Sequence, residues 1–176
     1  MAIAILFLAP ATAEDRRTAP SAFSSIAFPT GLVPEQADLT LRGRIGQSGI
    51  LCLDLKTIMS LPSITFRSVD PWDGKEHSFT GVSLKDFLAW AGIVDASSSL
   101  LLTAKNRYSI PIKRSDYETI SYVLAWMMDG KVFSDDPATR KRGPLAIAID
   151  FSKNKTLAME LYKHQLVWQL SDIQAQ

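Results

Sequence analysis

Short apolar runs separated by polar residues dominate the chain from residue 38 onward. Leu39 and Leu41 alternate with polar neighbours, and Ile64 and Phe66 repeat this period of two, as half-buried strands do. Other runs are apolar throughout, such as LAIAI at 145–149, which is typical of a fully buried strand. The pattern predicts strands at 39–45, 50–53, 63–68, 99–104, 108–112, 121–127, 131–133, 145–149 and 166–173.

Helical patterns are fewer and shorter than strand patterns. Asp54 is a predicted N-cap for a helix over 55–60, and Pro62 ends it. Ser83 is a predicted N-cap for a second helix, with apolar residues at helical spacing after it, and Gly92 ends that helix.

The remaining stretches predict turns and weak helices. Asp129-Gly130 predicts a tight hairpin turn, and helical pieces are expected at 113–119 and 157–164. The charged stretch 70–82 is interpreted as a turn that leads into the second helix. Strands outnumber helices and do not alternate regularly with them, so we predict no doubly wound parallel sheet. The predicted fold is a mixed α+β domain with a curled, largely antiparallel sheet and short scattered helices.

The first thirteen residues differ from the rest of the chain. An apolar stretch at 2–8 leads to Pro10 and then to Ala11-Thr12-Ala13, the order of an export signal with its cleavage site, although the usual positive n-region is missing. The alternative is a buried strand or short helix at the terminus. We therefore predict a signal peptide at 1–13, a flexible or lightly packed N-terminal arm at 14–37 and a domain at 38–176, with a periplasmic or secreted location.

Charge and composition argue against several classes of function, beginning with nucleic-acid binding. The net charge is +1, so no basic face for nucleic acid is expected, and no apolar run is long enough to span a membrane in the mature chain. Cys52 is the single cysteine, in an apolar run, and is expected to be buried and inert. The two histidines, His77 and His164, lie among polar residues far apart in sequence, and we expect surface positions for both.

A basic run precedes a Gly-Pro pair in the last third of the chain. Arg140, Lys141 and Arg142 beside Gly143 could hold an anionic group such as a phosphate. The alternative is a solvated loop. In both interpretations the three charges are exposed, so replacing all three with Ser is expected to change stability very little.

Six segments carry a family resemblance, and they follow one another along the chain: GILCLDLKTIMSLPSITF, WDGKEHSFTGVSLKDFLAWAG, NRYSIPIKRSD, LAWMMDGKVF, RGPLAIAID and ELYKHQLVWQLSDIQ. In this order they resemble the oxidoreductase molybdopterin-binding domain, the fold shared by sulfite oxidases and their bacterial relatives. The resemblance covers residues 38–174.

The resemblance implies molybdopterin as a cofactor, but it also exposes a departure from the family. Catalytic members carry a molybdenum-ligating cysteine four residues ahead of the position of Trp72, and that place falls on Ser68 here. Cys52 lies well upstream on another predicted strand. A serine hydroxyl is a harder ligand than a thiolate and would tune a metal differently. The candidate cofactor surface consists of Ser68, Trp72, Tyr108, Arg140, Lys141, Arg142 and Gly143. The three basic residues are candidates only by their proximity to the Gly143-Pro144-Leu145 motif.

Trp72 has two interpretations. Its ring could cover the open end of the sheet as a core lid, with its indole N–H bonded to a loop carbonyl. Alternatively it could wall a shallow pocket together with Tyr108 and the loop around residue 140. The other tryptophans, Trp90, Trp126 and Trp168, lie in periodic segments and are expected in the core.

We therefore expect an exported, stand-alone molybdopterin-binding-like domain without a cysteine-ligated molybdenum centre. Its partner would be a periplasmic protein or a small anionic ligand, bound at the surface that corresponds to the cofactor site of the resembled family. Two alternatives stay open: a functional periplasmic molybdopterin-dependent oxidoreductase that uses Ser68 or no protein ligand, and a structural or sensory module.

Overall fold

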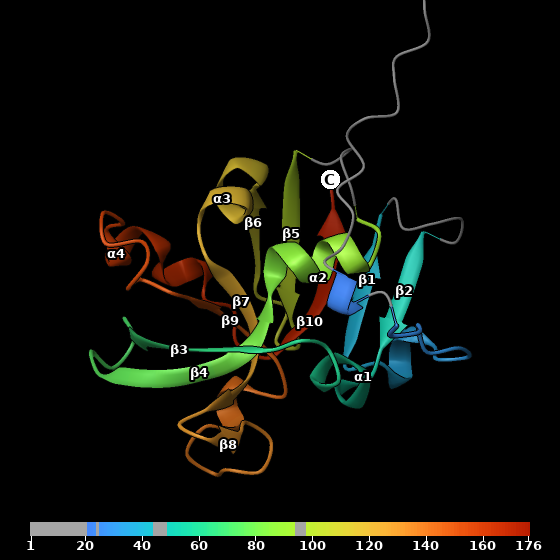
Figure 1. The fold of residues 1–176 in the computed structure, drawn as a ribbon, viewed down its shortest axis with the longest axis horizontal. Helices are drawn as coiled ribbons and strands as arrows, with labels where there is room; N and C mark the ends of the chain where they lie inside the picture. Colours follow the sequence, from blue (N-terminus) through green and yellow to red (C-terminus); the bar gives the residue numbers. More distant parts are fainter. Residues whose placement is uncertain (1–20, 24, 44–48, 94–97) are drawn as a thin grey trace, which may run out of the picture.

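Ten strands and several short helices make up the part of the chain that the computed structural model describes, residues 21–23, 25–43, 49–93 and 98–176 (Figure 1). The strands are β1 (Leu39–Arg42), β2 (Ile50–Leu53), β3 (Ile64–Val69), β4 (Glu76–Ser83), β5 (Ser99–Ala104), β6 (Ser109–Lys113), β7 (Tyr122–Met128), β8 (Lys131–Val132), β9 (Ala146–Ile149) and β10 (Leu170–Ala175). The α-helices are α1 (Leu55–Met59), α2 (Leu84–Trp90), α3 (Arg114–Thr119) and α4 (Met159–Tyr162), and the 3-10 helices are η1 (Ser21–Phe23), η2 (Pro34–Gln36), η3 (Arg140–Arg142) and η4 (Lys163–Gln165).

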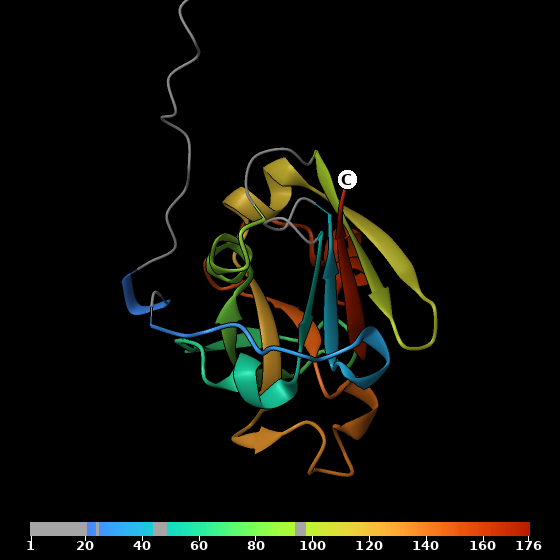
Figure 2. The same cartoon turned by 90° about the vertical axis from the view of Figure 1, so that its right-hand side faces the viewer.

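The strands form two sheets. Sheet A has the order β2-β1-β10-β5-β6, and its single parallel pair is β1 with β10. Figure 2 shows these strands side by side, with the β5–β6 hairpin at one edge. Sheet B has the order β3-β4-β7-β8, and β9 also pairs with β7.

Backbone hydrogen bonds join the two sheets where β9 meets the segment before β10. The Ile147 amide donates to the Val167 carbonyl at 2.8 Å, and the Leu170 amide donates to the Leu145 carbonyl at 2.9 Å. The two sheets are therefore joined here, and apolar side chains of both sheets share one interior. This arrangement confirms the predicted mixed α+β fold with largely antiparallel pairing and short helices.

Two apolar clusters fill the interior on opposite faces of β7. Tyr122, Leu124 and Trp126 point into the larger cluster, which α2 covers with Phe87 and Trp90. The residues between them belong to a smaller cluster of Phe66, Phe79, Val123, Ala125, Met128, Phe133, Ala146 and Ala148. Because alternate side chains of a strand point to opposite faces, nearly every residue of β7 is buried.

Part of the predicted N-terminal arm packs against this body. Phe23 belongs to the larger cluster, and the Trp90 indole donates a hydrogen bond to the Ile26 carbonyl at 3.2 Å. The ring of Phe28 lies 4.7 Å from that of Trp90. Residues 1–20, which contain the predicted signal peptide, lie outside the described residues.

Several local predictions are confirmed. The Asp54 carboxylate caps α1 by accepting the Thr57 amide at 2.8 Å, and Ser83 accepts the Asp86 amide at the start of α2. Asp129 and Gly130 both have positive φ, as a tight two-residue hairpin between β7 and β8 requires. Cys52 is buried. A separate observation, which tests none of these predictions, is that no helix within the described ranges is long and apolar enough to cross a membrane.

One interpretation is wrong, because the charged stretch is mostly strand. Residues 76–83 form β4, which pairs along its length with β3 and then with β7. The turn is confined to residues 70–75. Gly81 permits the close pairing, since a Cβ there would lie 2.3 Å from the Leu124 carbonyl oxygen. The last predicted strand also begins later than expected, at Leu170.

Candidate functional site: an aromatic pocket

The turn between β3 and β4 presents Trp72 to solvent. Within this turn the Asp70 amide donates to the Lys75 carbonyl and the Gly74 amide donates to the Asp70 carbonyl, both at 2.8 Å. The Asp70 carboxylate also accepts the Trp72 amide at 2.9 Å. The backbone around Trp72 is therefore held firmly, while its side chain remains 47 % exposed. A core-lid role for Trp72 is excluded by this exposure.

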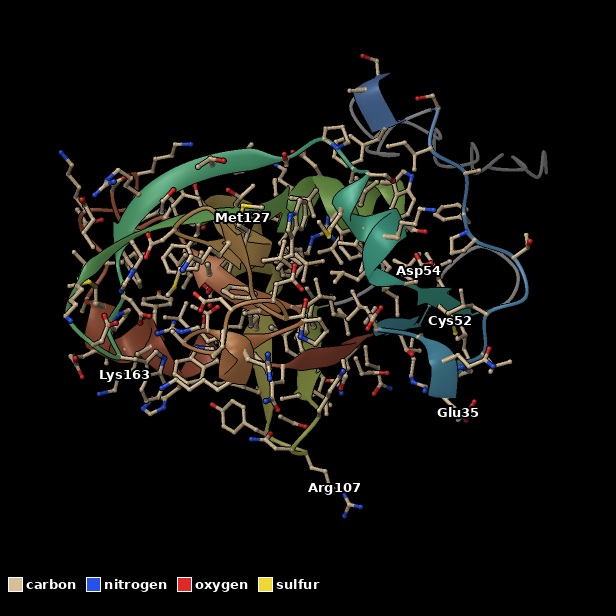
Figure 3. The ribbon with its side chains drawn as sticks, turned by 90° about the horizontal axis from the view of Figure 1, so that it is seen from below. Glu35, Cys52, Asp54, Arg107, Met127 and Lys163 are labelled. Carbon is tan, nitrogen blue, oxygen red and sulfur yellow. The ribbon has the colours of Figure 1, made fainter. Side chains whose placement is uncertain are left out.

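A second aromatic residue comes from the turn between β5 and β6. Arg107 has a positive φ of 69° and points away from the body at the tip of this turn (Figure 3). The next residue, Tyr108, is 41 % exposed, and its amide donates to the Asn106 side chain at 2.9 Å. The Tyr108 hydroxyl donates to the His164 carbonyl at 2.7 Å. This bond ties the turn to η4.

The back of the site is formed by Trp168 and η4. The Trp72 ring meets Trp168 edge to face at 5.7 Å and the His164 ring at 6.2 Å. A short hydrogen bond from the Tyr122 hydroxyl to Gln165 anchors η4 to β7. Burial raises the pKa of Tyr122 well above its usual value of 10.0, so this hydroxyl stays a neutral donor.

Together these side chains enclose a pocket of about 200 Å³, which we call the aromatic pocket. Its lining consists of Trp72, Ala104, Asn106, Tyr108, His164, Leu166 and Trp168. Small-molecule sites usually measure roughly 300–1,000 Å³. The aromatic pocket is therefore of a size for one or two fused rings rather than for a large cofactor.

The basic run divides into one buried and two exposed residues. Arg142 is 7 % exposed and forms an ion pair with the buried Asp70, while its guanidinium carbon lies 4.3 Å from the centroid of Trp168. Lys141 is exposed, with its ammonium 5.5 Å from the same centroid, and Arg140 is exposed as well. The expectation of three exposed charges is wrong for Arg142, because Asp70 draws it into the interior.

Lys141 differs from Arg142 in having its charge uncompensated. Among the residues that the structure describes, no carboxylate lies within ion-pair distance of Lys141 or Arg140. The Arg142 charge, by contrast, is offset by Asp70. Lys141 is therefore the cation beside Trp168 that is available to an anion.

Ser68 lies away from the aromatic pocket. It is 3 % exposed on β3, and its hydroxyl accepts the Phe151 amide at 3.1 Å. Beside it, a largely apolar cavity of about 20 Å³ is lined by residues that include Val69, Asp70 and Phe151. A cavity of this size holds about one water molecule.

These observations test whether the residues present fit a molybdenum centre ligated through Ser68, and they do not. The Ser68 hydroxyl is engaged by the backbone in a closed interior, and the Arg142 charge is committed to Asp70. Within the described ranges, no three His, Cys, Asp or Glu side chains are placed to hold a metal ion.

A separate polar cluster lies next to the turn of Trp72. His77 on β4 contacts Asp129 through Nδ1 at 2.7 Å and Asp73 through Nε2 at 2.9 Å. The imidazole is 14 % exposed, so the expected surface position holds only in part. Burial acts to lower the pKa of His77, but the two carboxylates outweigh it and raise the pKa overall.

The structure brings together some of the sequence-predicted site residues. Trp72 and Tyr108 share the aromatic pocket, and Lys141 and Arg142 reach it through Trp168. Arg140 is exposed and Ser68 faces the interior. Gly143 is buried against Phe133, where a Cβ would lie 2.5 Å from the Phe133 Cβ.

The sequence analysis missed Trp168, His164 and Asp70. Trp168 was expected in the core because it follows the apolar run before β10, yet it is only partly buried. No local signal distinguishes it from a core tryptophan. Asp70 directly precedes a tight turn, and this position could have marked it as a turn-stabilising residue. Its ion-pair partner Arg142 is remote in sequence, so the pair could not have been predicted.

The two-sheet α+β architecture, with its largely antiparallel pairing and short helices, is also found among solved structures. A solved structure that shares it is the sulfane dehydrogenase SoxCD from Paracoccus pantotrophus, with a TM-score of 0.59 and 12 % sequence identity. The likeness covers 82 % of this chain and 39 % of that one, so the chain corresponds to well under half of the length of SoxCD. At this identity the likeness shows the fold alone. No family model and no curated protein sequence matches the chain.

Proposed function

We propose that this chain is a ligand-binding module of the molybdopterin-oxidoreductase-like fold, and that its aromatic pocket takes a small planar aromatic anion. The observation that carries the proposal is the placement of two half-exposed aromatic side chains, Trp72 and Tyr108, around one concave pocket. Large aromatic surfaces left in water are worth about 25 cal/mol for each Å² that a ligand would cover. Lys141 beside Trp168 supplies the charge that selects an anion.

A small ligand suits this site better than a partner protein. A stable protein interface covers roughly 800 Å² on each partner. The aromatic pocket has a volume of about 200 Å³ and is concave, and its polar groups include Asn106, the Tyr108 hydroxyl and the His164 ring. One or two fused rings could stack between Trp72 and Tyr108, with an acidic group directed toward Lys141.

The binding test compares four probes by calorimetry and tryptophan fluorescence. 2-Naphthoate and pterin-6-carboxylate are expected to bind, whereas the neutral 2-naphthamide and the aliphatic hexanoate bind at least several-fold more weakly. Trp72→Ala should abolish binding and Lys141→Ser should weaken the acids but not the amide. Lys56→Ser, at an exposed position on α1, is the matched control for the loss of one lysine charge. Equal affinity for acid and amide, or no binding by any aromatic probe, refutes the proposal.

The oxidoreductase alternative has its own measurement. Molybdenum and pterin content should be determined for wild-type protein and for Ser68→Cys, purified from a host that makes the cofactor. Because the Ser68 side chain faces a closed interior, we expect neither protein to hold stoichiometric molybdenum. Stoichiometric metal in the wild type would favour the enzyme over the binding module.

We also propose that the chain is exported, on the apolar residues 2–8 followed by Ala11-Thr12-Ala13. Mass spectrometry of protein recovered from its native host should then give an N-terminus near Glu14. A mature protein that retains Met1 would remove the periplasmic or secreted assignment.

A further inference from the structure

His77 is held between two carboxylates that belong to two different turns. Its Nε2 lies 2.9 Å from Asp73 Oδ2 in the β3–β4 turn, and its Nδ1 lies 2.7 Å from Asp129 Oδ2 in the β7–β8 turn. A neutral imidazole has one N–H and can donate to only one of these carboxylates. The imidazolium has two N–H groups and can donate to both.

Each carboxylate is itself fixed by the backbone through its second oxygen. Asp73 Oδ1 accepts the Lys75 amide and Asp129 Oδ1 accepts the Ser78 amide, both at 2.9 Å. The cluster is therefore a bridge between two ordered turns and not a set of mobile surface charges. Asp73 directly follows Trp72, so the bridge ends one residue from the pocket wall.

We propose that His77 is a positioning residue of the aromatic pocket, clamping Asp73 toward Asp129 and so holding Trp72 in the wall of the pocket that it shares with Tyr108. This inference rests on the proposed function where it concerns ligand affinity. The other anchor of the turn is Asp70, which accepts the Trp72 amide and pairs with the buried Arg142. Two anchors flank Trp72, and only the His77 anchor carries a group that titrates near neutral pH.

The charges around His77 agree with a clamp that weakens as pH rises. The groups facing the cluster are Asp73 and Asp129 from the two turns, Arg67 and Glu76 from β3 and β4, and Arg142 from η3. Burial acts to raise the pKa of Asp73 and Asp129, but backbone hydrogen bonds and His77 lower both overall. Both carboxylates thus stay charged at neutral pH, and loss of the His77 proton is what opens one side of the clamp.

The experiment measures Trp72 directly and needs no ligand. Protein labelled with 5-fluorotryptophan gives one ¹⁹F signal for each of its four tryptophans, and Trp72→Phe assigns the signal of interest. Between about pH 6 and pH 9 the Trp72 signal should shift with a midpoint above the usual histidine value of 6.5. In His77→Gln this transition should be absent.

Two further variants test whether His77 itself causes the pH-dependent change in the Trp72 signal. Asp129→Asn leaves His77 in place but removes one carboxylate that raises its pKa, so the midpoint should move to lower pH. His164→Gln controls for the other histidine, whose ring lies near Trp72, and the transition should persist in it. A Trp72 signal that does not move with pH, or that titrates equally in His77→Gln, overturns the inference.

Affinity for 2-naphthoate provides the second readout, since its carboxylate stays ionised across this pH range. Affinity of the wild type should fall several-fold as pH rises through the ¹⁹F midpoint, and His77→Gln should bind weakly at every pH. If the Trp72 signal titrates but 2-naphthoate binds at no pH, the proposed function fails while the clamp on Trp72 stands. If 2-naphthoate binds with no pH dependence and the Trp72 signal is constant, the clamp fails while the proposed function stands.

Discussion

The ion pair between Arg142 and Asp70 supports a stability prediction that can be worked out from the structure. Arg142→Met removes the guanidinium but keeps an unbranched side chain that can lie on Trp168. It leaves the Asp70 carboxylate buried without its cation, since the two side chains are only 8 % and 2 % exposed. Removing one partner of a buried ion pair costs roughly 3–5 kcal/mol, so we expect a loss of stability in that range.

Urea unfolding followed by circular dichroism measures this loss. With a urea dependence of about 2 kcal/mol per molar, the midpoint of Arg142→Met should fall by about 2 M. Arg140→Met is the matched control, because it makes the same change two residues earlier on the same 3-10 helix at an exposed position. Its free energy of unfolding should stay within about 0.5 kcal/mol of the wild type.

A double variant separates the charge from the lost contacts. Asp70→Asn keeps an oxygen for the Trp72 amide but removes the negative charge that Arg142 compensates. Arg142→Met with Asp70→Asn should therefore be more stable than Arg142→Met alone, because no buried charge is left unpaired. The reasoning is refuted if Arg142→Met unfolds like Arg140→Met, or if the second substitution only adds to the loss.

Three further predictions concern β4, the exposed tryptophan and pH. Gly81→Ala should destabilise by about 2 kcal/mol or more in urea unfolding, since its Cβ would lie 2.3 Å from the Leu124 carbonyl oxygen; wild-type stability would contradict this. Trp72→Ala should cost only about 1 kcal/mol because the side chain is 47 % exposed, whereas Trp126→Ala, 3 % exposed, should cost roughly 3–5 kcal/mol, and equal losses would argue against the exposed position. Burial acts to lower the pKa of His77, but its two carboxylate partners outweigh burial and raise the pKa above 6.5 overall. The protonated His77 therefore stabilises the fold fully below about pH 6.5, and this stabilisation is lost as the pH rises through the raised pKa. The difference in free energy of unfolding between wild type and His77→Gln should therefore shrink toward alkaline pH, and a constant difference would contradict the linkage.

Much of the local structure could be predicted because its causes lie within a few residues. Asp54 and Ser83 each accept an amide three positions ahead, and Asp129-Gly130 supplies two positive φ values in succession. These signals depend on covalent neighbours and on backbone preferences that every chain shares. The strand β4 was missed because its charged residues resemble a turn, and only pairing with β3 and β7 makes it a strand.

The candidate site was predictable only in part. One of two interpretations of Trp72 was as the wall of a shallow pocket with Tyr108 and the loop around residue 140. Trp72 and Tyr108 do line the aromatic pocket, but no residue of that loop is among its lining. The pairing of Trp72 with Tyr108 was suggested by the family resemblance and by an unusual tryptophan in a charged stretch. Trp168, at the back of the pocket, looked like an ordinary core residue, because its contacts with Trp72 and Arg142 join distant segments.

The sequence by itself determined the strand-rich α+β class, most element positions, and the presence of a single cysteine, Cys52, in an apolar run. Only the tertiary structure decided where the polar side chains point. Ser68 shares the buried face of β3 with Phe66, and its distant partner there is the Phe151 amide, 83 positions away. Arg142 is buried, unlike its exposed neighbours Arg140 and Lys141, because the buried Asp70 carboxylate requires a compensating cation. Such choices depend on which distant segments the two sheets bring together, and no pattern of adjacent residues encodes the partner.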